Sequence, residues 1–517
     1  MNLQGRGGIF AATSAWTALA AVLAVRVAGR AADDFFITYR YAWNLVHGHG
    51  FVFNPGERVF GLTDPGLGLL LAGFNAITRV PIPILGTVTT AVSLVGIALV
   101  LLLDLGERGR RIEALAGGTL LVGSSWMWVS QGAGVFPSLL LLLLAARLAG
   151  RRAALAGLLA GAAVWMRPDA LAGAGLLGLL LWSERRLVPW RYAVVSLAVI
   201  GLGAGAAWLW FGTAVPNTVG AKIAMASAAA AVQDMDPLRF WVIASSFLPR
   251  HWGPWWAAVV ALGITGQVPL FLGSGRAGRL LVLFGAALAV IYPLIGAPFF
   301  IWYTAVTLAA LLYGLPALGL WWMRASAQPA TRPWRLAGGA VALAVFLPVF
   351  VSLIPRSCRW FRSYNWQRNL EVYQQAALWI RERSAPDEAI AYVEIGVLAY
   401  ASERPVVDLL GLVTPEAVPF VLANDLPGAF LARPAPWVLH HTRGRMESLI
   451  QRRWFRRNFR EVVRFEKPGG GRLTVYHIRR DARLPPPRPP REPAPPRTPG
   501  RRRGNVPKAG DGTPSSL

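Results

Sequence analysis

The side chains best suited to chemistry lie in one stretch, residues 33–65, which reads "DDFFITYRYAWNLVHGHGFVFNPGERVFGLTDP" and directly follows an apolar run. Asp33 and Asp34 are adjacent, and two neighbouring carboxylates repel each other, which raises the pKa of one of them. Such a carboxylate can act as a general base toward a hydroxyl group. Arg40 and Arg58 are suited to binding a phosphate. A base and a phosphate clamp at a bilayer surface are what an enzyme needs to use a lipid-phosphate-linked donor.

A helix must position these groups. On a helix over residues 33–47, spacings of 7, 4 and 3 place four polar residues near one face: Asp33, Arg40, Asn44 and His47. The opposite side is largely apolar, which predicts a helix lying at the membrane surface. An ordinary juxtamembrane helix with solvated charges is the alternative. His47 and His49 could bind a metal, but we favour hydrogen bonding or a structural role and expect no metal ligands.

The composition indicates a polytopic membrane protein. Of 517 residues, 54% are hydrophobic and 15% are charged, against about 25% charged in soluble proteins. The net charge of +26 resides in short loops between apolar runs and in a terminal tail, so it favours membrane orientation over nucleic-acid binding. The single cysteine, Cys358, excludes an intrachain disulfide and a cysteine-based metal cluster.

Eleven apolar runs are expected to span the membrane. They are residues 9–29, 83–104, 112–130, 133–149, 153–166, 169–182, 190–212, 253–273, 278–296, 299–322 and 335–355. The first lacks a cleavage motif and is read as a retained span. The run at 65–77 is short, so we predict an interfacial or re-entrant helix within the first external loop, residues 33–82.

Every second loop is basic, which places the amino terminus in the cytoplasm and residues 33–82, 213–252 and everything after about 356 outside. The chain therefore divides into three parts. Residues 1–355 form the transmembrane catalytic domain, and 356–480 form an extracytoplasmic α/β domain with strand-like runs such as "AIAYVEIGVLAY". Residues 481–517 are rich in Pro and Arg and are expected to be disordered.

The 33–65 stretch resembles the first external loop of bacterial GT-C superfamily glycosyltransferases, in particular the branch that contains the terminal arabinofuranosyltransferases of the actinobacterial cell wall. The resemblance implies transfer of a sugar, with inversion, from a polyprenyl-phosphate donor to a hydroxyl of a cell-envelope glycan, glycolipid or protein. It also implies that an acid at the start of this loop is the catalytic base. Asp33, the leading acid, is the first choice and Asp34 the close alternative.

Weaker similarities to the same family cover about residues 10–480. "RPDA" (167–170) contains Arg167, and "AVPNTVGAK" (214–222) contains Asn217 and Lys222. The resemblance implies donor-phosphate binding by Arg40, Arg58, Arg167 and Lys222, and substrate binding by Asn44, His47, Asp64 and Asn217. A local Arg–Asp pair is the alternative for Arg167, and an interfacial snorkelling lysine for Lys222. "FFIWYTAV" (299–306) resembles an aromatic start of a span. Glu394, Asp408 and Glu416 could line an acceptor groove, but we favour ordinary solvated acids or caps.

Two positions depart from the family pattern. Gly134 stands where an acid is expected, and Asp64 where an amide or histidine is more usual; both positions bear on the sugar or acceptor preference. The competing functional classes are a lipid or glycan transporter and a non-catalytic envelope scaffold. We found no internal repeat of the kind many transporters show. The sequence indicates no cofactor, leaves a divalent metal open, and predicts membrane lipids but no nucleic acid as further partners.

Overall fold

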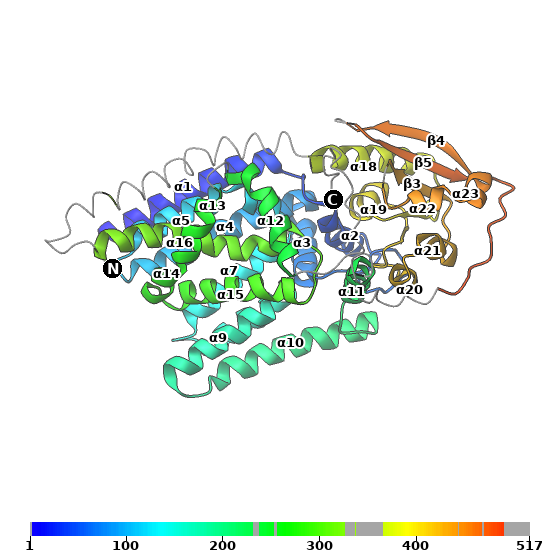
Figure 1. Cartoon of the computed structure of the whole chain (residues 1–517). Helices are drawn as coiled ribbons and strands as arrows, with labels where there is room; N and C mark the ends of the chain where they lie inside the picture. Colours follow the sequence, from blue (N-terminus) through cyan, green and yellow to red (C-terminus); the bar gives the residue numbers. More distant parts are fainter. Residues whose placement is uncertain are drawn as a thin grey trace, which may run out of the picture.

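The structure is a computed structural model of the chain that describes residues 3–230, 237–252, 256–325, 337, 365–442, 444–467 and 470–490. Helices dominate up to residue 325, and a smaller α/β domain caps one end of this helical region (Figure 1). The helical elements are α1 (Leu3–Val27), α2 (Asp33–Val46), α3 (Pro65–Thr78), α4 (Ile82–Gly106), α5 (Arg111–Gly123), α6 (Ser125–Val129), α7 (Val135–Leu148), α8 (Ala153–Met166), α9 (Ala170–Arg185), α10 (Trp190–Phe211), α11 (Asn217–Ala230), α12 (Pro237–Trp252), α13 (Trp256–Thr265), α14 (Gln267–Gly273), α15 (Arg276–Leu294), the 3₁₀ turn η2 (Ile301–Thr304) and α16 (Ala305–Ala325).

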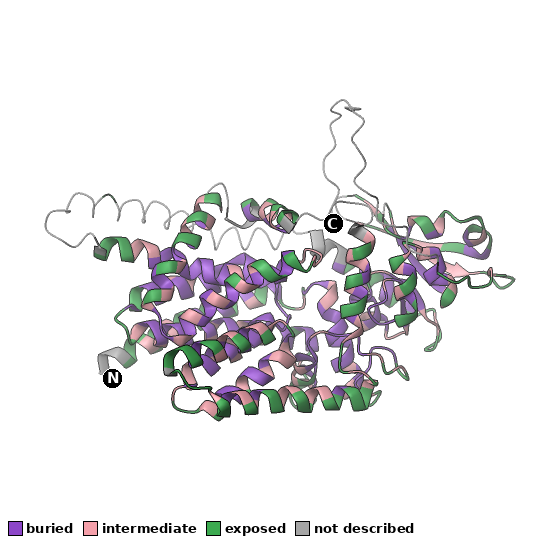
Figure 2. Ribbon diagram, turned by 60° about the horizontal axis from the view of Figure 1, so that its bottom comes forward, coloured by how far each residue is buried: buried purple, intermediate pink, exposed green. Residues whose placement is uncertain are grey.

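Six helical segments are long and apolar enough to cross a membrane: Arg6–Val27, Ile82–Gly106, Trp190–Phe211, Trp256–Gly273, Arg276–Leu294 and Ile301–Arg324. Shorter apolar helices accompany them, including α7, α8 and α9. Buried residues fill the centre of this region, whereas exposed residues follow its outer helices (Figure 2). The chain is a multi-pass membrane protein.

The spans expected from the sequence are helical in the structure wherever it describes them, with two interruptions. The predicted span 112–130 is divided between α5 and α6 at Ser124, whose backbone is extended. The predicted span 253–273 is divided between α13 and α14 at Gly266. There Gln267 donates to the carbonyls of Gly263 and Ala310, so its side chain binds one carbonyl in its own turn and another on a neighbouring helix. The expected eleventh span, 335–355, lies almost wholly outside the described residues.

The α/β domain begins with α18 (Asn365–Arg381) and carries a five-stranded sheet of order β2-β1-β3-β5-β4. Its strands are β1 (Ile390–Tyr392), β2 (Val406–Asp408), β3 (Trp437–His441), β4 (Phe459–Glu466) and β5 (Arg472–Ile478). The first three are mutually parallel, and β5 is antiparallel to β3 and β4. The connections contain α19 (Gly396–Ser402), η4 (Pro415–Ala417), α20 (Val418–Leu422), α21 (Leu426–Ala432), α22 (Glu447–Ile450) and α23 (Arg453–Asn458).

Polar contacts from the loop between α2 and α3 hold the α/β domain against the helical region. The Asn54 side chain accepts from the Val406 amide at 2.9 Å and donates to the Val406 carbonyl at 3.0 Å, so it pairs with the outer strand β2 as a backbone residue would. Glu57 forms an ion pair with Arg433 at the start of the α21–β3 connection. Because an exposed strand edge is otherwise a site of unwanted pairing, Asn54 both covers the edge and fixes the domain in place.

Candidate active site

The two acids begin the helix α2. Ala32 before them is extended (ψ 153°), and Asp33 and Asp34 occupy the first helical turn. Negative charge in the first turn of a helix is stabilised by the unpaired amides and the helix dipole. The predicted helix over 33–47 is confirmed to within one residue. Its predicted polar face is covered over most of its length, because α19 of the α/β domain packs against α2 and Arg40 and Asn44 are buried, whereas His47 at its end is exposed.

Asp33 joins the two domains. Its carboxylate accepts hydrogen bonds from the Gly396 amide at 3.0 Å and the Val397 amide at 2.8 Å, the first two amides of α19. Burial, together with the nearby Glu394 carboxylate, raises the pKa of Asp33 to about 8, although the two amides act in the opposite direction. The contact leaves no room for a side chain at position 396, since a Cβ there would lie 1.9 Å from the Asp33 carbonyl oxygen. We call this contact the Asp33 clasp.

Asp34 has a different environment although it is the next residue. Among the described residues no hydrogen bond to its carboxylate is recorded, and the side chain is only partly buried. Burial raises the pKa of Asp34, and the positive charge of Lys222 opposes that shift. The Asp34 carboxylate is therefore the less constrained of the two acids and faces a cation.

Lys222 lies on α11 and is held by aromatic side chains. Its Nζ donates to the Tyr303 hydroxyl at 3.2 Å and sits 5.2 Å from the Phe300 ring centroid and 5.7 Å from that of Tyr303. These distances fall within the range of cation–π attraction. Burial acts to lower the pKa of Lys222, but Tyr303 and Asp34 outweigh it and the pKa lies above its usual value. Lys222 is a charged group in the site rather than a side chain reaching for solvent.

Arg167 also lies near the Tyr303 ring. Its guanidinium donates to both oxygens of Asp169 at 2.9–3.1 Å and to the Tyr292 hydroxyl at 3.2 Å, and it lies 5.8 Å from the Tyr303 ring centroid. The Tyr292 and Tyr303 rings are stacked 4.1 Å apart. The local Arg–Asp pair expected as the alternative is present, and Arg167 also contributes positive charge near Lys222.

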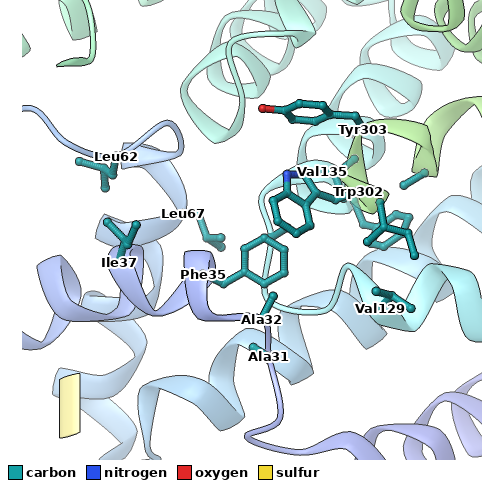
Figure 3. Close-up of a cluster of buried hydrophobic side chains, with 14 of the residues drawn as sticks. Ala31, Ala32, Phe35, Ile37, Leu62, Leu67, Val129, Val135, Trp302 and Tyr303 are labelled. Carbon is teal, nitrogen blue, oxygen red and sulfur yellow. The ribbon is translucent and has the colours of Figure 1, made fainter. Parts of the chain in front are cut away.

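Apolar side chains pack next to Asp34 and Tyr303. The Phe35 ring, one residue after Asp34, packs edge-on against Trp302 at 4.9 Å, and Figure 3 shows this pair beside Ala32 and Val135 with the Tyr303 hydroxyl directed away from it. The start of α2 and the start of the Ile301–Arg324 segment are thus packed together. That packing positions Asp34 relative to the aromatic side chains around Lys222.

Asp64 and Gly134, the two departures from the family pattern, are neighbours. Asp64 is buried and accepts hydrogen bonds from the Thr38 hydroxyl and the Gly134 amide. Burial raises the pKa of Asp64, while Thr38 and the charge of Arg167 oppose the shift. A Cβ at Gly134 would lie 2.1 Å from the Met166 carbonyl oxygen, so no side chain fits there. The carboxylate that lies against Gly134 is that of Asp64.

Four predicted site residues lie elsewhere. Arg40 donates to the Phe53 carbonyl at 3.2 Å and is buried towards α19, where burial lowers its pKa to about 10. Asn44 donates to the carbonyls of Val52 and Phe53 at 2.8 Å. The remaining two are exposed at the far side of the loop: Arg58, stacked on Trp210, and His47, stacked on Trp43. In this structure Arg40, Asn44 and His47 contact residues of α2 or of the loop that follows it, and Arg58 contacts Trp210 on α10.

Asn217 at the start of α11 ties three segments together. Its amide donates to the Phe60 carbonyl at 2.7 Å, and its side chain donates to the carbonyls of Gly411 and Leu412 at 2.6 and 3.0 Å. It fixes the helix that carries Lys222 against the α/β domain. Asn217 thus supports the site through α11 rather than through a free amide group.

Sequence reasoning did not single out Tyr303, and it ranked Glu394 as an ordinary acid. The segment "FFIWYTAV" was noted only as an aromatic start of a span, and the "VEIG" motif only as part of the external domain. The partners of these residues are 81 positions away for Tyr303 and about 360 away for the Glu394 loop. Within the described residues no group of three or more His, Cys, Asp and Glu is arranged to hold a metal ion.

Comparison with known proteins bears on the fold. A family profile described as "Domain of unknown function (DUF8728)" matches residues 362–476, which cover most of the α/β domain. Comparison with curated proteins gives no match.

Solved structures extend the likeness to about nine-tenths of the chain. ArnT from Cupriavidus metallidurans bound to undecaprenyl phosphate matches with a TM-score of 0.53 and 13% identity, over 91% of this chain and 99% of that one. Its apo state gives 0.51 and 12% over 89% and 97%. The arabinofuranosyltransferase AftD from mycobacteria gives only 0.40 and 13%, over 90% of this chain and 40% of that one, which is too low to carry an argument. The likeness to ArnT establishes the fold.

Proposed function

We propose, from the GT-C fold of this chain, that it is a membrane glycosyltransferase that takes a sugar from a polyprenyl-phosphate donor. ArnT, which shares the fold, has been solved with undecaprenyl phosphate bound. The observation that carries the proposal is the environment of Asp34. Its carboxylate is partly buried, and the positive charge of Lys222 stabilises its ionised form. A base facing a cation is the minimum that transfer from a phosphate-linked donor requires.

Asp34 is the proposed catalytic base. Two hydrogen bonds from α19 already occupy the Asp33 carboxylate, whereas no described group donates to that of Asp34. Consecutive residues of a helix point about 100° apart, so one acid can bind the α/β domain while its neighbour faces the helical region. The site therefore favours Asp34, the alternative in the sequence-based assignment, and gives Asp33 a positioning role.

The reaction is a direct displacement with inversion. Asp34 accepts the proton of an acceptor hydroxyl while that oxygen bonds to the anomeric carbon of the donor sugar. The bond from the anomeric carbon to the phosphate oxygen breaks on the opposite side, and polyprenyl phosphate leaves with the bonding electrons. The charge that develops on the phosphate is stabilised by cations held in place beforehand.

Lys222 and Arg167 are the proposed phosphate-binding cations. Both lie within 6 Å of the Tyr303 ring centroid. An ammonium group has three donors, and the hydrogen bond to the Tyr303 hydroxyl uses one of those of Lys222. Arg40 and Arg58, proposed from the sequence for the same role, have other contacts in this structure.

Arabinofuranose is the first specific donor sugar to test, because residues 33–65 resemble the arabinofuranosyltransferase branch. The acceptor is a cell-envelope glycan, glycolipid or protein. The proposed arrangement has a cytoplasmic amino terminus and places α2 and the α/β domain on the outer face.

The test uses full-length protein in lipid nanodiscs with polyprenyl phosphates of arabinofuranose, galactofuranose, mannose and glucose, and a mixture of short glycans as acceptors. Release of polyprenyl phosphate from one donor by the wild type, and its loss in Asp34→Asn, is the expected result. Folded wild type that releases none from any donor would favour transport or a scaffold. Release that survives in Asp34→Asn would place the base elsewhere.

A further inference from the structure

The α/β domain offers a ligand position of its own at the edge of its sheet that faces α2. The chain leaves β1 for β2 on one side and then crosses back to β3 on the other, in the order β2-β1-β3 with all three strands parallel. Open α/β sheets bind ligands outside the carboxyl ends of their strands, at the point where the strand order reverses. In this sheet that point lies between the ends of β1 and β3.

Chemically active side chains lie at this point. Glu394 follows the end of β1 by two residues, and its side chain is exposed to solvent. The charges of Lys467 and Arg445 act on its carboxylate, and the buried Tyr373 donates toward it. Lys467 in turn lies 2.5 Å from Nε2 of His441, the last residue of β3. A carboxylate, two cations and a phenol thus converge from four segments.

The Asp33 clasp brings this cluster to the proposed base. Asp33 is bonded to the amides of Gly396 and Val397, only two and three residues after Glu394. Asp34 is the residue next to Asp33, and its carboxylate is close enough to Glu394 for their charges to interact. The Asp34 carboxylate therefore interacts with the positive charge of Lys222 in the helical region and with the negative charge of Glu394 in the α/β domain.

Carboxylates and ammonium groups suit a particular ligand class. A carboxylate accepts hydrogen bonds from two neighbouring hydroxyl groups, and Lys and Arg donate to hydroxyl oxygens. Hydrogen bonds that involve a charged partner are roughly twice as strong as neutral ones. The mixed charge of Glu394, Lys467 and Arg445 suits a neutral molecule with several hydroxyls better than a second phosphate.

We propose that Glu394 after β1, together with Arg445 after β3 and Lys467 after β4, binds the hydroxyls of the acceptor sugar and places one of them beside Asp34. This inference rests on the proposed transferase function and assigns the acceptor to the α/β domain. An in-line displacement needs the acceptor oxygen and the departing phosphate oxygen on opposite faces of the anomeric carbon. Acceptor binding by the α/β domain, with the phosphate bound at Lys222 in the helical region, is compatible with that arrangement. Glu394 is a binding residue in this scheme, and Asp34 remains the base.

The first experiment measures binding without any donor. Saturation-transfer NMR records methyl arabinofuranoside, methyl galactofuranoside, methyl mannopyranoside and methyl glucopyranoside with the full-length protein in nanodiscs. The variants are Glu394→Gln, Lys467→Gln and the matched control Glu461→Gln, an exposed acid on β4 of the same sheet that pairs with Arg464. At least one glycoside should bind to the wild type and to the control variant. Its affinity for each of the other two variants should be lower by about tenfold or more. Equal binding to Glu394→Gln, or no binding to wild type, would overturn the proposal.

The second experiment separates this inference from the function on which it rests. With the donor that the wild type uses, Glu394→Gln should raise the KM for the acceptor about tenfold and leave the KM for the donor unchanged. Transfer with an unchanged acceptor KM would remove the acceptor subsite and leave the transferase intact. Glycoside binding that needs Glu394, without release of polyprenyl phosphate from any donor, would retain the subsite and contradict the transferase.

Discussion

Neighbouring residues can have different tasks because a helix turns about 100° between them. Asp33 and Asp34 illustrate this, since Asp33 accepts hydrogen bonds from α19 and Asp34 interacts with the positive charge of Lys222. The sequence located the pair and made Asp33 the first choice only because it comes first. The choice depends on the amides of Gly396 and Val397, which are 363 and 364 positions further along the chain. No local pattern contains that information.

Removing the cation opposite Asp34 should change both binding and pH dependence. The charge of Lys222 favours the ionised form of Asp34, so Lys222→Met should raise the pKa of Asp34 further. Because a base must be deprotonated, the acidic limb of the kcat/KM profile should move to higher pH. The donor KM should rise by about tenfold or more, since a charged hydrogen bond to phosphate is lost.

The control for this prediction is Arg151→Met, which removes a cation from an exposed loop between α7 and α8. It should leave the pH profile and the donor KM unchanged. An acidic limb that stays in place in Lys222→Met would contradict the charge interaction between Lys222 and Asp34.

Gly134 should tolerate no side chain. In Gly134→Ala the new Cβ would meet the backbone oxygen of Met166, which cannot rotate away. We expect a loss of about 1–3 kcal/mol in the free energy of unfolding, the usual cost of overpacking. The donor KM should also rise, because Met166 precedes Arg167.

Gly175→Ala in α9 is the matched control. Its Cβ meets nothing within 4 Å, so a gain of up to about 1 kcal/mol from helix propensity is expected. Thermal unfolding of both variants in the same nanodiscs makes the comparison, and equal midpoints would contradict the close contact at Gly134.

At the scale of elements, local sequence patterns predicted where helices form better than they predicted which elements contact each other. The spacing of polar residues gave α2 to within one residue, and the short apolar run 65–77 gave α3 (Pro65–Thr78). The break at Ser124 was missed because an extended residue within an apolar run leaves the hydropathy unchanged. The burial of Arg40 was missed because Tyr400, Glu403 and Arg404, which lie near it, are about 360 positions further along the chain.

The Asp33 clasp should contribute to stability more than to the chemical step. Asp33→Ala removes two hydrogen bonds and leaves the first amides of α19 without their acceptor. A loss of roughly 2–3 kcal/mol is expected, measured as a lower thermal midpoint. Asp387→Ala, which removes an exposed acid from a turn of the same domain, should leave the midpoint unchanged. Equal thermal midpoints in the two variants would show that the Asp33 clasp does not contribute to stability.

At the scale of the whole molecule, the proposed site needs both parts of the chain. The base and the cations come from the helical region, while Glu394 and the partner of Asp33 come from the α/β domain. Asn54, Glu57 and Asn217 fix the two parts against each other. The fold class and the existence of both parts could be predicted from hydropathy and strand patterns. Their junction could not, because it is made of contacts between distant segments.

The orientation of the chain is open to a direct test. In a Cys358→Ser background, cysteine at exposed Ser448 in α22 should react with a membrane-impermeant maleimide in intact cells. Cysteine at Arg151 should react only after the membrane is permeabilised, because the basic loops are expected on the cytoplasmic side. The reverse pattern would place the α/β domain inside the cell.

The measurement that tests the central claim most directly compares Asp34→Asn with Asp33→Asn on the donor that the wild type uses. Asp34→Asn should lower the rate of polyprenyl-phosphate release by about 10²–10⁴-fold, the usual contribution of a general base, with an unchanged thermal midpoint. Asp33→Asn should lower the midpoint and retain more of the rate. A full rate in Asp34→Asn, with the rate lost in a stable Asp33→Asn protein, would contradict the account and make Asp33 the base.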